Sequence, residues 1–348
     1  MSGQVAGTPL VSVGMPVFNG QGTIRAVLES VLAQSYQNLE IVVFDNGSTD
    51  GTTEAVVAAS QGDERVRLDI GESNRGASFS FNRTFELATG EYFLWVAADD
   101  IIGPDYVSSA VARLEGDPDV VMSAPAVTVY LEGHTEPVYE VHIEGFGPET
   151  SRFDRMLRSM NGFPMVTMYG VIRSSALAAS RLFKPSHMSD VALMQELALR
   201  GAIVETPEQH LNYYMAQQWK TTAEEYRHFK GGDVEPRVVL PFLPLLVDRV
   251  QRIWSLELGM ATRIGYVLVV LFAECRRLGV RAAWRCYRSL VGSPRASSIG
   301  QRLYWRWMHV PSVEVRDMPV FMERVIRPTM GLSPTGHTVR PLSPPDEM

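Results

Sequence analysis

The first half of the chain alternates short apolar runs with amphipathic segments, and this alternation limits the folds that it can adopt. Residues 39–44 are mostly β-branched or aromatic and run into the turn-forming residues 45–48. Such a run is typical of a buried parallel strand that ends in a turn. Similar runs lie at residues 11–19, where Pro16 is expected to stop the strand, and at residues 90–100, which end in two carboxylates. This alternation with helices predicts an α/β fold, a mostly parallel sheet covered on both faces.

The segments between these runs have helical periodicity. One helix face is predicted from the spacing of Ile24, Val27, Leu28, Val31 and Leu32. A second helix is expected to start at Pro104, with an apolar face of Val107, Ala110, Val111 and Leu114. Asp50 is predicted to cap a third helix, with Glu54 in its first turn. Residues 191–200, closed by Gly201, predict another helix.

The turn at residues 45–48 allows two interpretations. In an open α/β sheet, a nucleotide binds at the carboxyl edge of the strands, which is where this turn is expected to lie. The alternative is an ordinary connection from strand to helix without a ligand.

Four motifs in order favour the first interpretation. They read Met-Pro-Val-Phe-Asn at 15–19, Phe-Asp-Asn-Gly-Ser-Thr-Asp-Gly at 44–51, Asn-Arg-Gly at 74–76 and Trp-Val-Ala-Ala-Asp-Asp at 95–100. In this order they resemble the family 2 glycosyltransferases, a large inverting family with the Rossmann-like GT-A fold. The resemblance covers roughly residues 8–215 and is to the bacterial branch that builds cell-surface polysaccharides and glycolipids.

The resemblance implies a set of nucleotide-binding residues. Asp45 would accept a hydrogen bond from the base, most typically from uracil N3–H, so a UDP or dTDP donor is favoured and a GDP donor stays open. The full set implied by the resemblance is Pro16, Phe18, Asn19, Asp45, Asn46, Asn74, Arg75, Gly76 and Asp100.

The resemblance also implies a metal site. Asp99 matches the metal-binding carboxylate of the family's Asp-x-Asp motif, where Mg²⁺ or Mn²⁺ would neutralise the leaving diphosphate. Ala97 departs from the Asp that is frequent at the first position of that motif. The alternative is that Asp99 and Asp100 belong to a solvated loop in which an Asp caps the next helix.

An inverting transfer needs one general base and no second carboxylate as nucleophile. In the family an acidic residue just before a late helix has this role, and Asp190 matches it. The alternatives are that Asp190 only caps the helix, or that Glu196 is the base, although Glu196 falls inside the helix. Residues 164–173 resemble the strand that lines the acceptor pocket. Residues 215–220 stand where relatives carry a closing loop, but without its Arg, for which Trp219 or Lys220 could substitute.

Charge is divided unevenly along the chain. Residues 237–327 contain 15 Arg, no Lys and 6 acidic residues, which gives +9, whereas the net charge of the chain is −7. Basic, aromatic helices in this stretch could lie on an anionic membrane surface, form a homodimer interface, or simply pack on the catalytic domain. The apolar run at residues 264–273 is too short to span a bilayer, which takes roughly 20 residues.

Three parts are therefore expected: a GT-A catalytic domain over residues 1–220, a helical region over 221–330, and a flexible tail over 331–348. Only two cysteines are present and the first residues are not those of a signal sequence, so a cytoplasmic protein is expected, with peripheral contact to the inner face of the membrane left open. The acidic balance and the absence of a recognised motif disfavour a nucleic-acid partner.

The leading hypothesis is an inverting, metal-dependent hexosyl- or deoxyhexosyltransferase. It would move a sugar from a nucleotide-diphosphate sugar to a hydroxyl of a glycan or a lipid-linked acceptor. Two alternatives are a non-catalytic nucleotide-sugar-binding or scaffold protein of the same fold, and a nucleotidyltransferase. The scaffold hypothesis is motivated by Ala97 and the altered closing loop. The nucleotidyltransferase hypothesis lacks the Gly-rich, basic phosphate loop that it needs.

Overall fold

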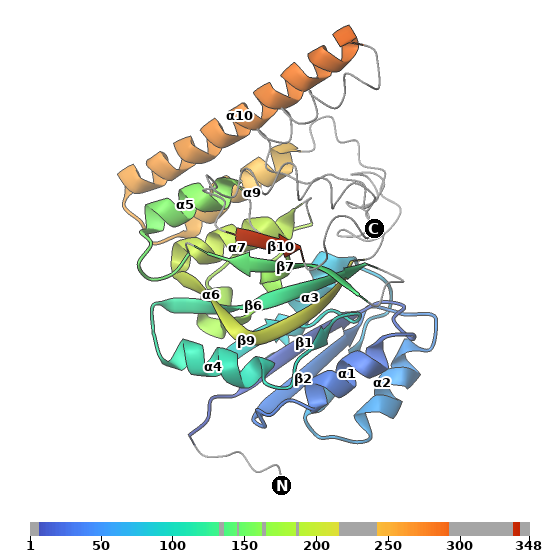
Figure 1. The fold of residues 1–348 in the computed structure, drawn as a ribbon. Coiled ribbons are helices and arrows are strands. Elements are labelled where there is room, and N and C mark those ends of the chain that lie inside the picture. Colours follow the sequence, from blue (N-terminus) through green and yellow to red (C-terminus); the bar gives the residue numbers. More distant parts are fainter. Residues whose placement is uncertain are drawn as a thin grey trace.

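The computed structural model describes residues 7–131, 136–144, 146–161, 165–185, 188–215, 242–291 and 337–341. One twisted sheet forms its centre, and helices cover both faces (Figure 1). The strands are β1 (Val11–Val17), β2 (Leu39–Asp45), β3 (Val66–Ile70), β4 (Tyr92–Trp95), β5 (Ile101–Ile102), β6 (Val120–Leu131), β7 (Pro137–Ile143), β8 (Val171–Arg173), β9 (Ala202–Met215) and β10 (His337–Pro341). The helices are α1 (Ile24–Leu32), α2 (Thr52–Ser60), α3 (Ala77–Glu86), α4 (Tyr106–Glu115), α5 (Arg152–Asn161), the 3₁₀ helix η1 (Met165–Tyr169), α6 (Ser174–Ala178), α7 (Ser189–Arg200), α9 (Phe242–Ser255) and α10 (Met260–Val291).

The first half of the chain forms the parallel part of the sheet. The strand order here is β4-β1-β2-β3, and each pair of neighbours is parallel. This confirms the α/β fold predicted from the alternation of strands and helices. Because the chain leaves β1 towards β2 but later returns to β4 on the other side, β1 and β4 flank a topological switch point. Ligands of open α/β sheets bind at the carboxyl edge of such a point.

The second half of the sheet is mixed, which the first half does not predict. Strand β8 is antiparallel to β4 and β6, and β7 is antiparallel to β6, whereas β9 is parallel to β6. The strand expected over residues 164–173 is wrong for most of its length, because residues 165–169 form η1. Strand β6 comes so close to the chain at Gly170 that a Cβ there would lie 2.4 Å from the Ser123 carbonyl oxygen. The pairing of β8 with β6 starts directly after this glycine, at Val171.

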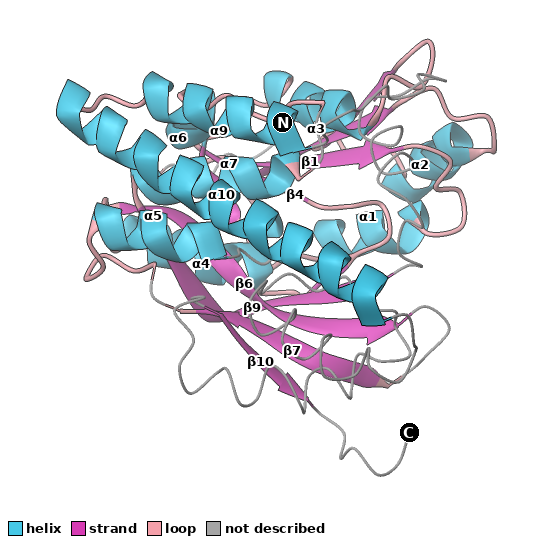
Figure 2. Cartoon of the chain, turned by 90° about the horizontal axis from the view of Figure 1, so that it is seen from above, coloured by secondary structure: helices cyan, strands magenta, loops and turns pink. Residues whose placement is uncertain are grey.

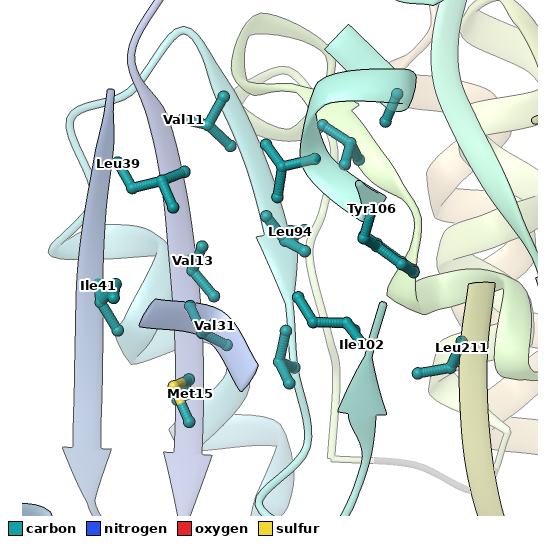
Figure 3. Close-up of a cluster of buried hydrophobic side chains, with 14 of the residues drawn as sticks. Val11, Val13, Met15, Val31, Leu39, Ile41, Leu94, Ile102, Tyr106 and Leu211 are labelled. Atoms are coloured by element: carbon teal, nitrogen blue, oxygen red, sulfur yellow. The ribbon is translucent and has the colours of Figure 1, made fainter. Parts of the chain in front are cut away.

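Side chains alternate between two cores on the faces of the sheet. Along β4, Tyr92, Leu94 and Val96 pack towards α1, α2 and α4, whereas Phe93 and Trp95 pack towards α3, α6 and α7. Figure 3 shows part of the first core, in which Val13 and Leu94 lie near Val31 of α1. Strand β1 makes room for α3 at Gly14, where a Cβ would lie 2.7 Å from the Thr84 hydroxyl oxygen. This period of two is expected of strands buried on both faces.

A third layer, made of α5, α9 and α10, lies on the outer side of α7 (Figures 1 and 2). Helix α7 is buried from Ser189 to Leu199 because the sheet covers one side of it and this layer covers the other. The residues that form the apolar contact are Met156, Met160, Leu199, Ile253, Leu256, Tyr266 and Val270. The two helices of the basic C-terminal stretch therefore pack on α5 and α7.

Buried ion pairs accompany this contact. Glu196 of α7 accepts hydrogen bonds from Arg252 Nη1 at 2.7 Å and from Arg200 Nη2 at 2.6 Å. Arg252 also donates to Asp248 at 2.8 Å, and Arg249 pairs with Glu274 of α10. Since the Arg249 and Arg252 side chains are each only 3% exposed, they are not the solvated arginines that a surface helix would carry.

Within the predicted tail over residues 331–348, His337–Pro341 forms β10, an antiparallel edge strand on β7. Two local predictions need correction. Helix α2 is capped by Gly51 with φ +107°, although Asp50 still accepts the Thr52 N–H at 3.1 Å. Strand β1 continues through Pro16 to Val17. The N–H that Pro16 lacks would point to the side of β4, where pairing has already ended at Gly14.

Candidate functional site

The loops that follow β1 and β2 are joined by hydrogen bonds. Asn19 donates its backbone N–H to the Ser48 hydroxyl at 2.8 Å, and its side-chain oxygen accepts the Thr49 N–H at 2.9 Å. Asn19 has φ +52°, a left-handed conformation that Asn tolerates better than most residues. Beside it, Pro16 is buried in β1 and Phe18 is 44% exposed, so of these two only Phe18 is open to a ligand.

Asp45 ends β2 with a fully buried carboxylate. Its Oδ1 accepts the Ser48 N–H at 2.9 Å and its Oδ2 accepts the Thr53 hydroxyl at 2.6 Å. These bonds hold the turn closed and tie it to the start of α2. Each carboxylate oxygen has a second acceptor position, so this role does not exclude the predicted bond to a base. Sequence reasoning missed Thr53, whose only signal is its place in the first turn of the following helix.

Asn46 connects this turn to the 74–76 loop. Its side-chain oxygen accepts the Arg75 N–H at 3.1 Å, and its amide donates to the Asn74 side-chain oxygen at 3.0 Å. Asn74 in turn accepts the N–H of Gly76 at 2.8 Å, where φ is +85°. The two loops touch at Gly47, because a Cβ there would lie 2.7 Å from Ser73 Cα. The structure thus brings together the predicted residues of two distant motifs.

Arg75, in the loop before α3, lies over Phe79 in the first turn of that helix. Its guanidinium carbon lies 3.5 Å from the centre of the Phe79 ring, and Phe79 packs edge-on against Phe44 of β2 with ring centres 5.7 Å apart. This cation–π contact fixes the cation at the rim of the two loops.

Replacing Asn46 by Ala should destabilise the joined loops. The change removes three hydrogen bonds at a residue that is 2% exposed and leaves the Arg75 N–H without its partner. We expect the free energy of unfolding to fall by about 1–3 kcal/mol, measured by urea denaturation. Asn38→Ala, which removes one exposed side-chain bond to Thr8, is the matched control and should change it by less than about 0.5 kcal/mol. Equal losses in both variants would contradict the role of Asn46.

Two adjacent carboxylates follow β4 at the switch point. Asp99 is exposed, yet the atoms packed around its carboxylate remove part of its hydration and raise its pKa. Asp100 is 1% exposed, and burial together with the charge of Asp99 raises its pKa well above the ordinary value. Its Oδ1 lies 3.4 Å from the Tyr214 N–H, and its Oδ2 is buried without a hydrogen-bond partner. These observations disfavour the alternative of a solvated loop for Asp100.

This pair fits a divalent cation. A buried carboxylate oxygen without a partner beside a second carboxylate supplies hard oxygen ligands, which Mg²⁺ and Mn²⁺ prefer. Within the parts of the chain that the structure describes, no group of three or more His, Cys, Asp or Glu side chains could hold a metal ion by itself. An ion at Asp99 and Asp100 would therefore need further ligands from phosphate or water.

Tyr169, at the end of η1, is subject to the charges of carboxylates from two segments, the loop after β4 and the start of α7. Burial raises the pKa of Tyr169 well above its ordinary value, and the charges of Asp100, Asp99 and Asp190 act in the same direction. The backbone carbonyl of Tyr169 accepts a hydrogen bond from the Tyr106 hydroxyl at 2.7 Å. The ring centres of Tyr169 and Tyr213 are 6.4 Å apart. The charges of the predicted base and of the predicted metal carboxylates thus act on the same side chain. Sequence reasoning did not single out Tyr169, which falls in an apolar segment.

Asp190 lies in the first turn of α7 and is 6% exposed. The N-cap position of this helix is Met188, with φ +56°, and no side chain caps it. The alternative that Asp190 is the N-cap is therefore wrong, although its charge still favours the helix N-terminus. Glu196 lies one and a half turns further on, where its carboxylate is occupied by Arg200 and Arg252, which supports a structural role.

The predicted closing-loop residues Trp219 and Lys220 fall outside the described residues.

Comparisons with known proteins agree with this geometry. Residues 12–177 match the family model for glycosyl transferase family 2. An uncharacterized glycosyltransferase of Rickettsia felis is 40% identical over 103 residues, which cover 30% of this chain and 17% of that protein. Glycosyltransferase GlyA of Streptococcus pneumoniae is 28% identical over 176 residues, which cover 48% of this chain and 25% of that protein. The chain thus spans a quarter or less of these two relatives' length.

The fold has counterparts among solved structures. A crystal structure of residues 1–349 of S. aureus TarS in complex with UDP superposes with a TM-score of 0.54 at 18% identity, over 90% of this chain and 78% of that one. At this identity the likeness shows the fold, which is the GT-A fold. The family match ends at residue 177, so it does not cover Asp190.

Proposed function

We propose that the chain, whose residues 12–177 match the family model for glycosyl transferase family 2, transfers a sugar from a nucleotide-diphosphate sugar to an acceptor hydroxyl. The observation that carries the proposal is the Asp99–Asp100 pair at the carboxyl edge of β1 and β4, where Asp100 Oδ2 is buried without a hydrogen-bond partner beside a second carboxylate. A cation site is then close to loops of the kind that bind a nucleotide. Asp190, whose charge acts on Tyr169 as the charges of Asp99 and Asp100 do, is the proposed proton acceptor.

The donor half of the site consists of the loops after β1, β2 and β3. Asp45 and Asn46 would face the base, and the 74–76 loop would border the ribose and diphosphate. TarS, which has the same fold, has been crystallised with UDP and with UDP-GlcNAc, and this supports a nucleotide-sugar donor. The buried acceptor oxygens of Asp45 suit the N3–H of uracil or thymine, so we propose a UDP or dTDP donor.

The acceptor half provides the base. In an inverting displacement, the acceptor oxygen bonds to the anomeric carbon as the bond from that carbon to the diphosphate breaks. Asp190 takes the proton of the acceptor hydroxyl. Asp99 and Asp100 would hold Mg²⁺ or Mn²⁺, which neutralises charge on the leaving diphosphate. Because Asp190 is buried, its carboxylate is shielded from water that could otherwise compete with the acceptor.

A binding or scaffold protein without turnover is the second candidate. Ala97 favours it, since this position lacks the Asp that is frequent in the family, whereas the presence of Asp45, Asp99 and Asp190 favours an enzyme. Acceptors of the bacterial relatives suggested by the motifs are glycans or lipid-linked glycans of the cell surface, and we propose that class here. Sugar release from the donor in the presence of such acceptors separates the two candidates.

A thermal-shift panel of UDP, dTDP, GDP and CDP, each with and without Mn²⁺, tests the donor site. We expect one pyrimidine nucleotide to raise the melting temperature when Mn²⁺ is present. At a concentration about 100 times the dissociation constant, the gain in stability would be about 2.7 kcal/mol. No shift with any nucleotide would contradict the proposal.

Replacing Asp99 by Asn should remove the metal-dependent part of this shift, because a neutral amide is a poorer ligand for a divalent cation than a carboxylate. The shift with nucleotide alone should stay as it is in the wild type. The matched control is Asp119→Asn, an exposed Asp immediately before β6, at the opposite edge of the sheet. Full Mn²⁺-dependent stabilisation in the Asp99 variant would show that the cation binds elsewhere.

A further inference from the structure

Helix α10 has one buried side and one exposed apolar side. Tyr266 and Val270 are buried against α5 and α9, whereas Phe272 is 73% exposed and Leu268 58% exposed. The exposed side repeats at helical spacing and consists of Met260, Ile264, Leu268, Leu271 and Phe272. From Met260 to Phe272 this stripe is roughly 18 Å long. Soluble monomers rarely expose so many large apolar side chains together, and such a surface usually meets a partner.

The second half of the same helix is basic. Residues 275–291 contain five arginines, at 276, 277, 281, 285 and 288, and no acidic residue. The acidic residue of α10 is Glu274, which is 6% exposed and pairs with Arg249 of α9. The helix therefore combines an exposed apolar stripe with an arginine-rich sequence, which is the pattern of a helix that lies in the plane of an anionic membrane.

The position of α10 suits such a contact. It is the outermost helix, and α9, α5 and α7 separate it from the sheet (Figure 1). The Arg249–Glu274 pair and the Tyr266 contacts hold its buried side in place, so the exposed stripe is presented on a fixed support. Among the described residues, no helix has the length and apolar content needed to cross a bilayer.

We propose that the exposed stripe of α10 docks the protein on the surface of an anionic lipid bilayer. A second copy of the chain is a poorer occupant, because it would bring the same arginine-rich helix and no exposed acidic residue of α10 to neutralise it. Anionic headgroups supply that missing charge, and the apolar side chains enter the boundary between headgroups and acyl chains.

Cosedimentation of the full chain with vesicles tests the proposal. The vesicles contain phosphatidylcholine alone, or phosphatidylcholine with phosphatidylglycerol. We expect binding to the anionic vesicles that weakens as salt is added, and binding to neutral vesicles that is weaker by about ten-fold or more. In the variant L268E/F272E, binding to anionic vesicles should fall by about ten-fold or more, because charge enters the apolar stripe.

V57E is the matched control, since Val57 is 59% exposed on α2, far from α10 in the fold, and it should bind vesicles as the wild type does (Figure 1). L268S/F272S is a milder second variant, should the Glu pair reduce the melting temperature. Vesicle binding that survives in both stripe variants would overturn the proposal, and so would a wild type that binds neither vesicle. A wild-type dimer that dissociates in the stripe variants without any vesicle binding would make this face an interface between copies instead. The cosedimentation experiment contains neither a sugar donor nor a sugar acceptor, so its outcome does not depend on the proposed sugar transfer.

Discussion

Replacing Asp190 by Asn should lower kcat by about 10²-fold or more while the affinity for the nucleotide stays close to that of the wild type. Asn has nearly the same shape but cannot accept the proton of an acceptor hydroxyl. Asp190 does not belong to the loops proposed to hold the nucleotide, and its charge acts on Tyr169 together with the charges of Asp99 and Asp100. The measurements are initial rates of sugar transfer at saturating donor, and nucleotide affinity by calorimetry.

Asp154→Asn is the control for this experiment. Asp154 also lies in the first turn of a helix, α5, but it is exposed and bonds only to Ser151 next to it. Its substitution tests the general effect of removing a negative charge from a helix N-terminus, which is worth about 0.3–1 kcal/mol of stability. A kcat that is unchanged in the Asp190 variant would show that Asp190 serves the helix and not the reaction.

Replacing Glu196 by Ala should reduce the free energy of unfolding by about 3–5 kcal/mol, the largest loss of stability that we expect from one side chain here. The Glu196 side chain is 0% exposed, and it pairs with Arg252, which is 3% exposed, and with Arg200. It also accepts the backbone N–H of Arg181 at 3.1 Å. Its removal leaves the buried charge of Arg252 with less compensation and leaves a backbone donor unpaired.

Denaturant unfolding measures this loss, and two variants define its cause. Glu29→Ala removes an exposed ion pair with Arg25, at 56% and 59% exposure, and should cost no more than about 1 kcal/mol. Glu196→Gln keeps the acceptor oxygen and most of the volume, so it should retain part of the stability that Ala loses. If Ala and Gln at position 196 were both as stable as the wild type, the ion pairs would contribute nothing to the packing of α9.

The parallel half of the sheet and the positions of its loops could be predicted from the sequence because they depend on local chemistry. Apolar runs that stop at Asp45 or at Asp99 place polar groups at one edge of a parallel sheet whatever follows in the chain. The hydrogen bonds that join Asn46 to Asn74 could not be predicted, since they depend on how closely two loops approach after folding.

The second half of the chain was less predictable for the same reason. Strand β8 is three residues long and is set by its neighbours, and β10 exists because β7 offers it an open edge. The burial of Glu196 follows from the packing of α9, which lies more than 40 residues later in the chain. The residue spacing in α7 predicts that Glu196 lies in the helix. It does not predict whether the Glu196 side chain faces water or an arginine of another helix.

The burial of α7 between the sheet and α9 also bears on the order in which the protein becomes complete during synthesis. The ribosome releases α7 well before α9, so for that interval the nascent chain holds Glu196 without Arg252. At this stage Arg200 of the same helix is the arginine that pairs with Glu196, and this incomplete compensation of a buried charge opposes closure of the second core, which contains most of the apolar side chains of α7. We therefore expect the half of the chain that carries the nucleotide loops to become protease-resistant only after residue 255 has emerged from the ribosome. Co-translational maturation of the site then depends on α9, a helix that contributes no residue to the site.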